Sequence, residues 1–564
     1  MALNMRQPLP PCCHAVNPGV KDATKADFKT GLSKYAVSSK QESVARLADA
    51  LAEAHSTLRL DRNATSAVSG TSQSAAFSHV EDIQTYIKNI ETYLALVKGF
   101  MTPSLAQKGL VVTPIRTVET DGDASTPSSA LRQPLIEDYS PKEDAAKIGA
   151  ASEATDKAPK DAAAPSTANA RSQHDPPKTL SECLGFCQWK DALSNAIMFA
   201  PNARIEYAQA LLASGVFMMN SARDKVDVLL ARRLSEIDEQ ELKLAYQLFL
   251  HAAGVLDACL ESIDVTPRTV GAKTTDLSAE PEPDAKTEGS GVDTIPDDDM
   301  MAKWRAEQQA SSQPNTATTT AAVATNTMKA PGIKNDDLAH LNRIPDLARG
   351  RYPQLLAWIA LAEAQELVIL RGISREFVDY SLMARLSMDI SIRYKECHAF
   401  ATQMLPCSTS PVADKLRLYS TFKEAYYSAI SCYFQGAASM EKDTAASCAQ
   451  AIANFKKAKT MLLITVTRKQ NYEAQVQKDE GKERLETFRS IFIRSEQIVD
   501  RDLDIMTHRN DSVYYERIPQ PEPPCEPLSL VRAVAFPAVE INASVGSQPD
   551  GASPTQRPTT VELL

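Results

Sequence analysis

The hydrophobic residues of this chain recur mostly three or four positions apart, which is the spacing of a helix face. Val44, Leu47 and Leu51 share one such face. A longer stripe is formed by Ile83, Ile87, Ile90, Leu94 and Val97. Residues 203–263 and residues 414–475 each predict two long amphipathic helices on either side of a polar turn. Alternation typical of β-strands is scarce, so the pattern predicts an all-α fold.

The two helix pairs contain an internal repeat. Ala, Phe, Ala and Leu stand at offsets 0, 4, 7 and 11 in both pairs: Ala245, Phe249, Ala252 and Leu256, and then Ala451, Phe455, Ala458 and Leu462. The small residues let a neighbouring helix approach closely, and Phe fills the gap beside them. The pattern resembles the second helix of a tetratricopeptide repeat, although its period of about 34 residues is not sustained. Two well-packed helix pairs are the alternative, and both interpretations predict a solenoid-like helical body.

Two internal stretches differ from the rest in composition. Residues 103–177 are rich in Ala, Ser, Thr and Pro with almost no aromatic residues, and residues 267–331 are similar. Such segments bury too little apolar surface to offset the entropy of ordering them. We therefore predict two disordered insertions. The sequence after Pro519 is rich in proline and is expected to be extended.

The overall composition excludes some classes of protein. The 564 residues carry a formal charge of −10, which argues against a general nucleic-acid binder. No apolar run reaches membrane-spanning length, and the first residues lack the pattern of a signal peptide. The ten cysteines include no Cys-x-x-Cys pair, so free thiols in a reducing compartment are expected. We expect a cytoplasmic protein whose contact with membranes is peripheral only.

No catalytic or metal-binding motif is apparent. Glu363 and Glu366 lie about one turn apart within an apolar run, but the Glu-x-x-His motifs of a di-iron bundle are absent. Cys12, Cys13 and His14 have no second ligand pair nearby, so we interpret them as part of an unremarkable N-terminal segment. We therefore expect no enzymatic activity, no cofactor and no metal. The two carboxylates are predicted to pair with basic or backbone donors of neighbouring helices, because unpaired buried charges are costly.

Several short segments, in order along the chain, resemble the BRO domain family of ESCRT-accessory proteins. The most specific is Leu361–Glu366, with the sequence LAEAQE. The others are Trp189-Lys190-Asp191-Ala192, the helix ELKLAYQLFLHAAGVLDACLESI, the segment SCYFQG and the segment SVYYERIPQPEP. The resemblance implies a curved, boomerang-shaped BRO domain with a tetratricopeptide-like solenoid core. It would span residues 1–545, interrupted by the insertions 103–177 and 267–331 and followed by a disordered tail, residues 546–564.

The resemblance also implies a partner. Members of this family bind the C-terminal helix of ESCRT-III subunits of the charged multivesicular body protein type in a groove, by the helix-in-groove mode. The matching positions here are Val368, Ser381 and Arg385, with Leu382 adjacent and Glu239 as an acidic neighbour. Ser381 and Arg385 stand where the family has apolar residues. Arg385 should weaken binding unless its stem lies along the surface with its charge in water.

Two functions follow from this resemblance. The first is an adaptor of the endosomal ESCRT pathway in multivesicular body sorting or membrane remodelling, recruited from the cytoplasm to endosomal membranes. The alternative is a BRO-type scaffold whose ESCRT-III site has drifted and which binds another protein. Proteins that bind proline motifs are further candidate partners, through the C-terminal tail. Tyr514 stands where a related adaptor has a phosphorylatable tyrosine, and packing against the end of the domain is its alternative role.

Overall fold

The computed structural model describes residues 9–19, 21, 23–33, 41–58, 77–101, 184, 187–230, 237–268, 339–375, 377–404, 410–477 and 482–540. They all belong to one compact unit, Met1–Thr113 with Thr179–Leu564. The predicted insertion 103–177 and the predicted tail 546–564 lie outside the described residues. So does the predicted insertion 267–331 except for Pro267 and Arg268, and Arg268 is hydrogen-bonded through its backbone to Gln354 and Trp358.

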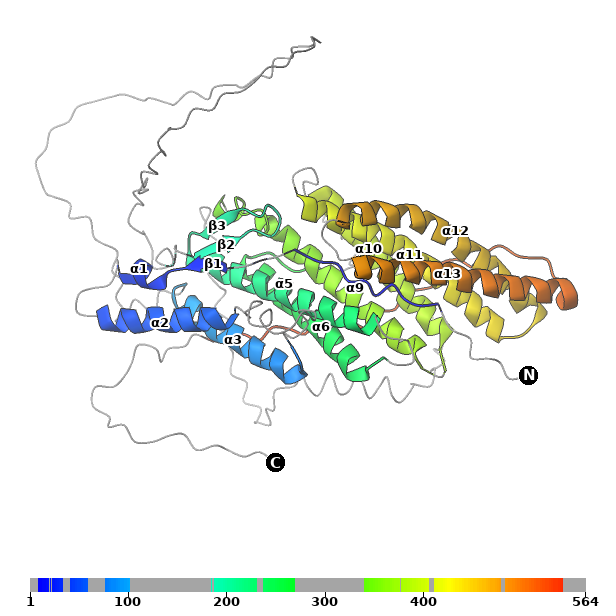
Figure 1. Ribbon diagram of the computed structural model, residues 1–564, viewed down its shortest axis with the longest axis horizontal. Coiled ribbons are helices and arrows are strands. Elements are labelled where there is room, and N and C mark those ends of the chain that lie inside the picture. The colour runs from blue at the N-terminus through cyan, green and yellow to red at the C-terminus, as the bar shows by residue number, and fades with distance from the viewer. Residues whose placement is uncertain are drawn as a thin grey trace, which may run out of the picture. The chain divides into compact units, whose positions relative to one another are not determined.

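The described residues are mainly helical, which confirms the predicted class (Figure 1). The long helices are α2 (Gln41–Leu58), α3 (Val80–Gly99), α5 (Ala203–Leu230), α6 (Glu239–Ser262), α9 (Arg351–Ile373), α10 (Tyr380–Met404), α11 (Pro411–Glu441), α12 (Ala445–Val476) and α13 (Lys482–Arg509). Shorter elements are α1 (Phe28–Ser33), the 3-10 turn η4 (Ala348–Gly350) and the π-helical turn η5 (Asn510–Tyr514). Within the described residues, no helix combines the length and the apolar character needed to cross a bilayer.

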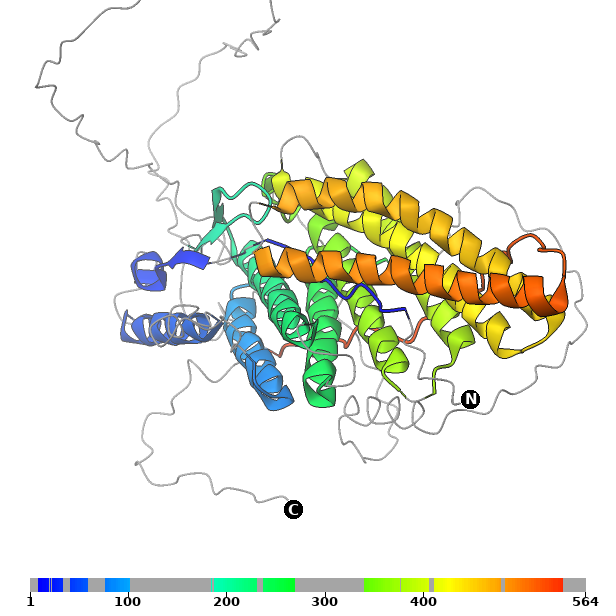
Figure 2. The ribbon, with the colours of Figure 1, turned by 45° about the vertical axis from the view of Figure 1, so that its right-hand side comes forward.

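Successive long helices pack against one another. α2 contacts α3, α3 contacts α5, and the series continues through α6, α9, α10, α11 and α12 to α13 (Figures 1 and 2). The predicted apolar stripes face the core: Val44, Leu47 and Leu51 are buried on α2, and so is the stripe from Ile83 to Val97 on α3. Helical periodicity therefore identified both the elements and their buried faces. The solenoid geometry stays a prediction.

The Ala-Phe-Ala-Leu repeat lies on α6 and α12, and all eight of its residues are buried. Close helix approaches occur beside it, at a glycine on the preceding helix in each pair. A Cβ atom on Gly215 would lie 2.7 Å from Leu256, and one on Gly436 would lie 2.7 Å from Phe455. The two pairs thus share a packing device in which a repeat side chain fills the space left by a glycine.

A small antiparallel sheet was not predicted. Its strands, β1 (Ala23–Ala26), β2 (Cys187–Lys190) and β3 (Ile197–Ala200), pair in that order, with Trp189 opposite Ala23 and Met198. Four-residue strands are too short to show the alternation that marks a longer strand. The sequence therefore gave no signal for them.

The Trp-Lys-Asp-Ala segment anchors this sheet to the helices. The indole of Trp189 donates a hydrogen bond to the buried Glu206 carboxylate at 2.7 Å. Asp191 follows β2 and accepts hydrogen bonds from the backbone of Leu193 and Ser194, which fixes the turn to β3. Its other oxygen accepts from the backbone N–H of Asp346 at 3.0 Å. The segment therefore acts as a structural joint.

Two extended segments cross the helices. We call Leu9–Gly19 the N-terminal strap and Glu516–Glu540 the C-terminal strap; the former is the dark-blue trace in Figure 2. Cys12, Cys13 and His14 are buried in the N-terminal strap, so the interpretation of these residues as an unremarkable segment was wrong. The C-terminal strap is extended, as the proline content predicted, and it contacts α6 where Val534 N–H donates to the carbonyl of Leu250 at 3.1 Å.

Gly254 on α6 is expected to be essential for seating the C-terminal strap. A Cβ atom there would lie far closer than 3.0 Å to the carbonyl oxygen of Val534, and a backbone oxygen cannot rotate away. Gly254→Ala should displace the strap and lower the free energy of unfolding by about 1–3 kcal/mol. Hydrogen exchange at residues 528–536 should increase. Gly372→Ala is the control, because its nearest atoms belong to the flexible side chain of Met383; equal effects of both substitutions would contradict the expectation.

Candidate functional site

Helix α9 explains why an apolar run contains two carboxylates. Between Tyr352 and Leu370 every residue except Leu361 is buried, so the helix has neighbours on all sides. A helix that is apolar all round is a core helix. Glu363 and Glu366 therefore lie in the interior, where each needs partners from other elements.

Glu366 forms a buried ion pair with Lys423 of α11. The Lys423 Nζ atom lies 2.7 and 2.8 Å from the two carboxylate oxygens, and both side chains are essentially inaccessible to solvent. The hydroxyl of Tyr394 on α10 donates to the same carboxylate at 2.7 Å. Lys423 also donates to the carbonyl of Cys12 in the N-terminal strap at 2.5 Å. One ion pair therefore joins α9, α10, α11 and the strap.

Glu363 binds the strap directly. Its Oε1 atom accepts a hydrogen bond from the Val16 backbone N–H at 2.9 Å, and it shares the single hydroxyl proton of Tyr419, at 2.8 Å, with the carbonyl of His14. Burial, together with the nearby charge of Glu366, raises the pKa of Glu363 to about 8. The predicted pairing with basic or backbone donors of neighbouring helices is confirmed for Glu366, whereas the backbone donor of Glu363 lies in the N-terminal strap and its helical donor is a tyrosine.

Burial also raises the pKa of Glu366 to about 7, although Lys423 opposes the shift. Both carboxylates could in principle serve in acid–base chemistry. However, Glu363 and Glu366 are each at most 2% exposed, and their donors are structural. Among the described residues, no group of three or more His, Cys, Asp or Glu side chains is placed to hold a metal ion. The arrangement functions as a clamp that positions the strap between helices.

The clamp extends along the whole N-terminal strap, because helix side chains bind its carbonyl oxygens. Tyr426 donates to Pro10, Lys423 to Cys12, Tyr419 to His14, Arg484 to Ala15, Tyr352 to Pro18 and Asn220 to Gly19. An extended segment in a core has no ladder partner for these carbonyls, and leaving them unpaired would be costly. The strap is therefore recognised through its backbone by α5, α9, α11 and α13.

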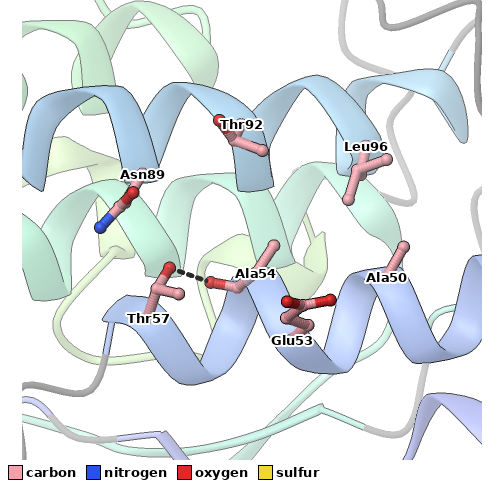
Figure 3. Close-up of a pocket in the computed structure, with 7 residues that line it drawn as sticks. All are labelled: Ala50, Glu53, Ala54, Thr57, Asn89, Thr92 and Leu96. Atoms are coloured by element: carbon pink, nitrogen blue, oxygen red, sulfur yellow. Dashed lines mark hydrogen bonds between the residues drawn. The ribbon is translucent and has the colours of Figure 1, made fainter. Parts of the chain in front are cut away.

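A surface hollow between α2 and α3 is a poor candidate for a reactive site (Figure 3). It has a volume of about 330 Å³ and is lined by Ala50, Glu53, Ala54, Thr57, Asn89, Thr92 and Leu96. Glu53 is the one ionisable residue in this lining, and Thr57 donates to the carbonyl of Ala54 in its own helix. The hollow contains no pair of groups that could exchange a proton.

Three adjacent helices carry the residues predicted to bind a partner. Glu239, the first residue of α6, is 71% exposed and pairs with Arg371 of α9. Val368 lies one turn before Arg371 and is 3% exposed. Glu239 therefore lies beside the part of α9 that contains Val368. The side chain of Val368 itself is buried and does not reach the surface.

The remaining predicted residues lie in the first turns of α10. Ser381 is exposed, Leu382 is half-buried, and the side chain of Arg385 is 37% exposed. A Cβ atom on Gly372 of α9 would lie 2.7 Å from Met383, so this turn of α10 packs closely on the end of α9. Glu239, Ser381, Leu382 and Arg385 accordingly lie around one region of α6, α9 and α10, which we call the α9–α10 surface; Val368 is buried in α9.

Arg385 contacts the C-terminal strap. Its Nε atom donates to the carbonyl of Glu526 at 3.4 Å, and its own carbonyl accepts from the backbone N–H of Leu528 at 3.2 Å. The guanidinium group lies 3.9 Å from the Glu526 carboxylate. Its charge therefore remains at the surface, which is the condition under which an arginine is tolerated beside an apolar groove.

Tyr514 packs at the end of α13. Its ring stacks on the guanidinium group of Arg509, with 5.4 Å between the carbon atom of that group and the ring centroid, and its hydroxyl lies 3.4 Å from Asp443. Arg509 and Asp443 also form an ion pair. A phosphate on Tyr514 would add about −1.5 to −2 charges beside Asp443. Its modification stays a prediction, and the neighbouring Tyr515 is much more exposed.

The sequence prediction missed one prominent residue of the α9–α10 surface. Phe377, in the turn between the two helices, is 85% exposed. The sequence did contain a signal for this residue. Phe377 lies four residues before Ser381, in a turn where Val378 is the other apolar residue. It was overlooked because the predicted positions came from a resemblance that did not include this turn.

One comparison with known proteins agrees with the resemblance noted in the sequence. The family model of the BRO1-like domain matches residues 307–552. A solved structure described as the structural basis for endosomal targeting by the Bro1 domain aligns with 93% of this chain and 93% of its own, with 14% identity and a TM-score of 0.45. A search of curated protein sequences finds no match.

Proposed function

We propose that this chain, whose residues 307–552 match the BRO1-like domain, is a non-enzymatic adaptor of the endosomal ESCRT pathway. In this proposal the α9–α10 surface binds the C-terminal helix of an ESCRT-III subunit of the charged multivesicular body protein type. The protein would be recruited from the cytoplasm to endosomal membranes through that partner, and would act in multivesicular body sorting or membrane remodelling.

The observation that carries the proposal is the grouping of Glu239 on α6 with Leu382 and Arg385 on α10, because both helices pack against α9. Glu239 is far from Leu382 and Arg385 in the sequence, and a partner helix needs apolar and charged contacts within a few turns of one another. Arg371 links Glu239 to α9, and the close packing of Gly372 against Met383 links α9 to α10. The rigid packing of α9 in the core supports a preformed surface, which lowers the entropy cost of binding.

The C-terminal strap supports a second contact. Pro521, Pro523, Pro524 and Pro527 are exposed on an extended backbone, the form in which proline motifs are recognised. Lys457 and Gln435 hold this stretch by donating to the carbonyls of Glu522 and Pro523. We propose the strap as the binding segment for proteins that recognise proline motifs.

The adaptor function is tested by titrating a synthetic C-terminal helix of an ESCRT-III subunit against the full chain. Leu382→Asp should weaken binding by at least about tenfold, because it places a charge where an apolar contact forms. Ser381→Arg, at an exposed position that leaves the fold intact, should weaken it in the same direction. Val368 is unsuitable for this test, because a charge at a position that is 3% exposed would destabilise the fold itself.

Leu463→Asp is the matched control, since Leu463 is an exposed leucine on α12, outside the α9–α10 surface. Thermal unfolding of each variant separates loss of binding from loss of fold. Equal affinities of wild type, Leu382→Asp and Ser381→Arg would contradict the placement of the surface. A wild-type chain that binds no ESCRT-III helix would favour the alternative, a BRO-type scaffold with a drifted site that binds another protein.

A further inference from the structure

Phe377 is the most exposed of the large apolar side chains in the described residues, at 85%. It lies in the turn between α9 and α10, four residues before Ser381, so the two Cα atoms are within about 14 Å of each other. Val378 and Leu382 next to it are partly buried and pack against the core. An aromatic ring presented to water beside a partly apolar helix face is typical of a residue that is buried in a complex.

Arg385 lies on the same side of α10 as Ser381, one turn further on. Its ion pair with Glu526 is loose, because the two groups are 3.9 Å apart and the Glu526 side chain is 86% exposed. Exposed pairs of this kind contribute little to stability. The guanidinium group can therefore exchange Glu526 for a carboxylate of a partner without a large loss.

We propose that Phe377 and Arg385 together determine which partner the α9–α10 surface accepts: an amphipathic protein helix that buries an apolar side chain against Phe377 and places a carboxylate against Arg385. This inference rests on the proposed adaptor function and specifies the chemistry of its partner. Arg385, which stands where the family has an apolar residue, would then add electrostatic specificity to an apolar groove.

The charges around this surface favour a protein helix over an anionic membrane. Exposed carboxylates lie at Asp379, two residues after Phe377, at Glu526 beside Arg385, and at Glu239 beside Arg371 of α9. Arg371 is engaged with Glu239, and the Asp379 side chain caps α10 by accepting from the backbone N–H of Leu382. A lipid surface would bring many negative charges against these carboxylates. A single helix can place one carboxylate at Arg385 and avoid the others.

The test uses the full chain and a synthetic C-terminal helix of an ESCRT-III subunit with glutamate on its polar edge. Phe377→Ala should weaken binding by at least about tenfold. Arg385→Glu should also weaken it. A second peptide, in which those glutamates are replaced by lysine, should bind wild type poorly and should bind Arg385→Glu better than wild type.

Leu463→Ala is the control for loss of an exposed apolar side chain, and Arg46→Glu on α2 is the control for charge reversal at an exposed arginine. Both should bind like wild type. The inference is overturned if wild type binds the first peptide but Phe377→Ala behaves like Leu463→Ala, or if the lysine peptide does not discriminate between wild type and Arg385→Glu. If wild type binds neither peptide, the adaptor function itself fails and this inference fails with it. Binding of anionic vesicles that is lost in Phe377→Ala, without peptide binding, would also overturn it.

Discussion

Replacing Lys423 with Met is expected to lower the free energy of unfolding by about 3–5 kcal/mol, the typical cost of removing one partner of a buried ion pair. The substitution leaves the Glu366 carboxylate without its cation in the core, and it also removes the donor to the carbonyl of Cys12. Met fills a volume similar to that of Lys, so the effect reports the lost charge and hydrogen bonds more than a cavity. Chemical denaturation of the full chain measures it.

Lys29→Met provides the matched control, because Lys29 pairs with Asp49 at 3.0 Å while both side chains are about two-thirds exposed. Its effect should not exceed about 1 kcal/mol. Adding Glu366→Gln to Lys423→Met should recover part of the stability, because without Lys423 the pKa of Glu366 rises further and the carboxyl must take up a proton in the core, which an amide need not do. If Lys423→Met costs no more than Lys29→Met, the ion pair does not hold the strap and helices together.

The helices were predictable from the sequence because their stability depends on a periodic face. The stripe from Ile83 to Val97 is visible in a window of fifteen residues, and the structure buries all of it on α3. The Ala-Phe-Ala-Leu repeat was likewise visible on α6 and α12. The glycines that face it, Gly215 and Gly436, were not recognised as its partners, because they lie on the preceding helices.

The straps were less predictable, because an extended segment that binds side chains has no periodic signature. Val16 and Glu363 are 347 positions apart, and their hydrogen bond leaves no local trace. The proline content did indicate an extended C-terminal segment, but it gave no information about where the segment packs. The small sheet was missed for a related reason, since its strands are four residues long.

For the buried carboxylates, the kind of partner was predictable and its identity was not. The physical cost of an unpaired buried charge required donors near Glu363 and Glu366. Tyr419 and Lys423 are four residues apart on α11, which matches the one-turn spacing of the two carboxylates on α9. This matched spacing on two helices was the one sequence feature that could have identified Tyr419 and Lys423 as the partners. On the α9–α10 surface, the resemblance indicated Ser381 and Arg385, but only the structure drew attention to Phe377.

The stability of the chain is expected to decrease as the pH rises from 7 to 9, and Glu363 contributes to this decrease. Burial beside Glu366 raises the pKa of Glu363 from about 4.5 to about 8 in the folded chain. Between these values the folded state binds a proton that the unfolded state has released. The free energy of unfolding therefore falls as the pH rises from about 4.5 to about 8, by up to about 1.4 kcal/mol per pH unit for one group. The fall levels off once the pH has passed the pKa of the folded state.

Between pH 7 and 9, most of the groups near Glu363 do not change their protonation state. Burial lowers the pKa of His14, so this residue opposes folding only below its ordinary value of 6.5. Lys423, Tyr394 and Tyr419 have raised pKa values in the folded chain, and their ordinary values already lie at 10 or above. Glu366, with a pKa of about 7, contributes in the same direction as Glu363 but mainly at the lower end.

Glu363→Gln isolates the carboxyl group, because an amide keeps the shape and cannot ionise. Its oxygen can still accept from the Val16 backbone N–H and from Tyr419, so the strap should stay in place. The free energy of unfolding of Glu363→Gln should depend less on pH than that of wild type, and the difference between the two should grow in favour of the variant from pH 7 to pH 9. Buried cysteines such as Cys12, whose pKa is raised to about 11, lower the stability of both proteins near pH 9 and cancel in this difference. Parallel unfolding curves of wild type and Glu363→Gln, separated by a constant amount at every pH, would show that Glu363 is already ionised in the folded chain.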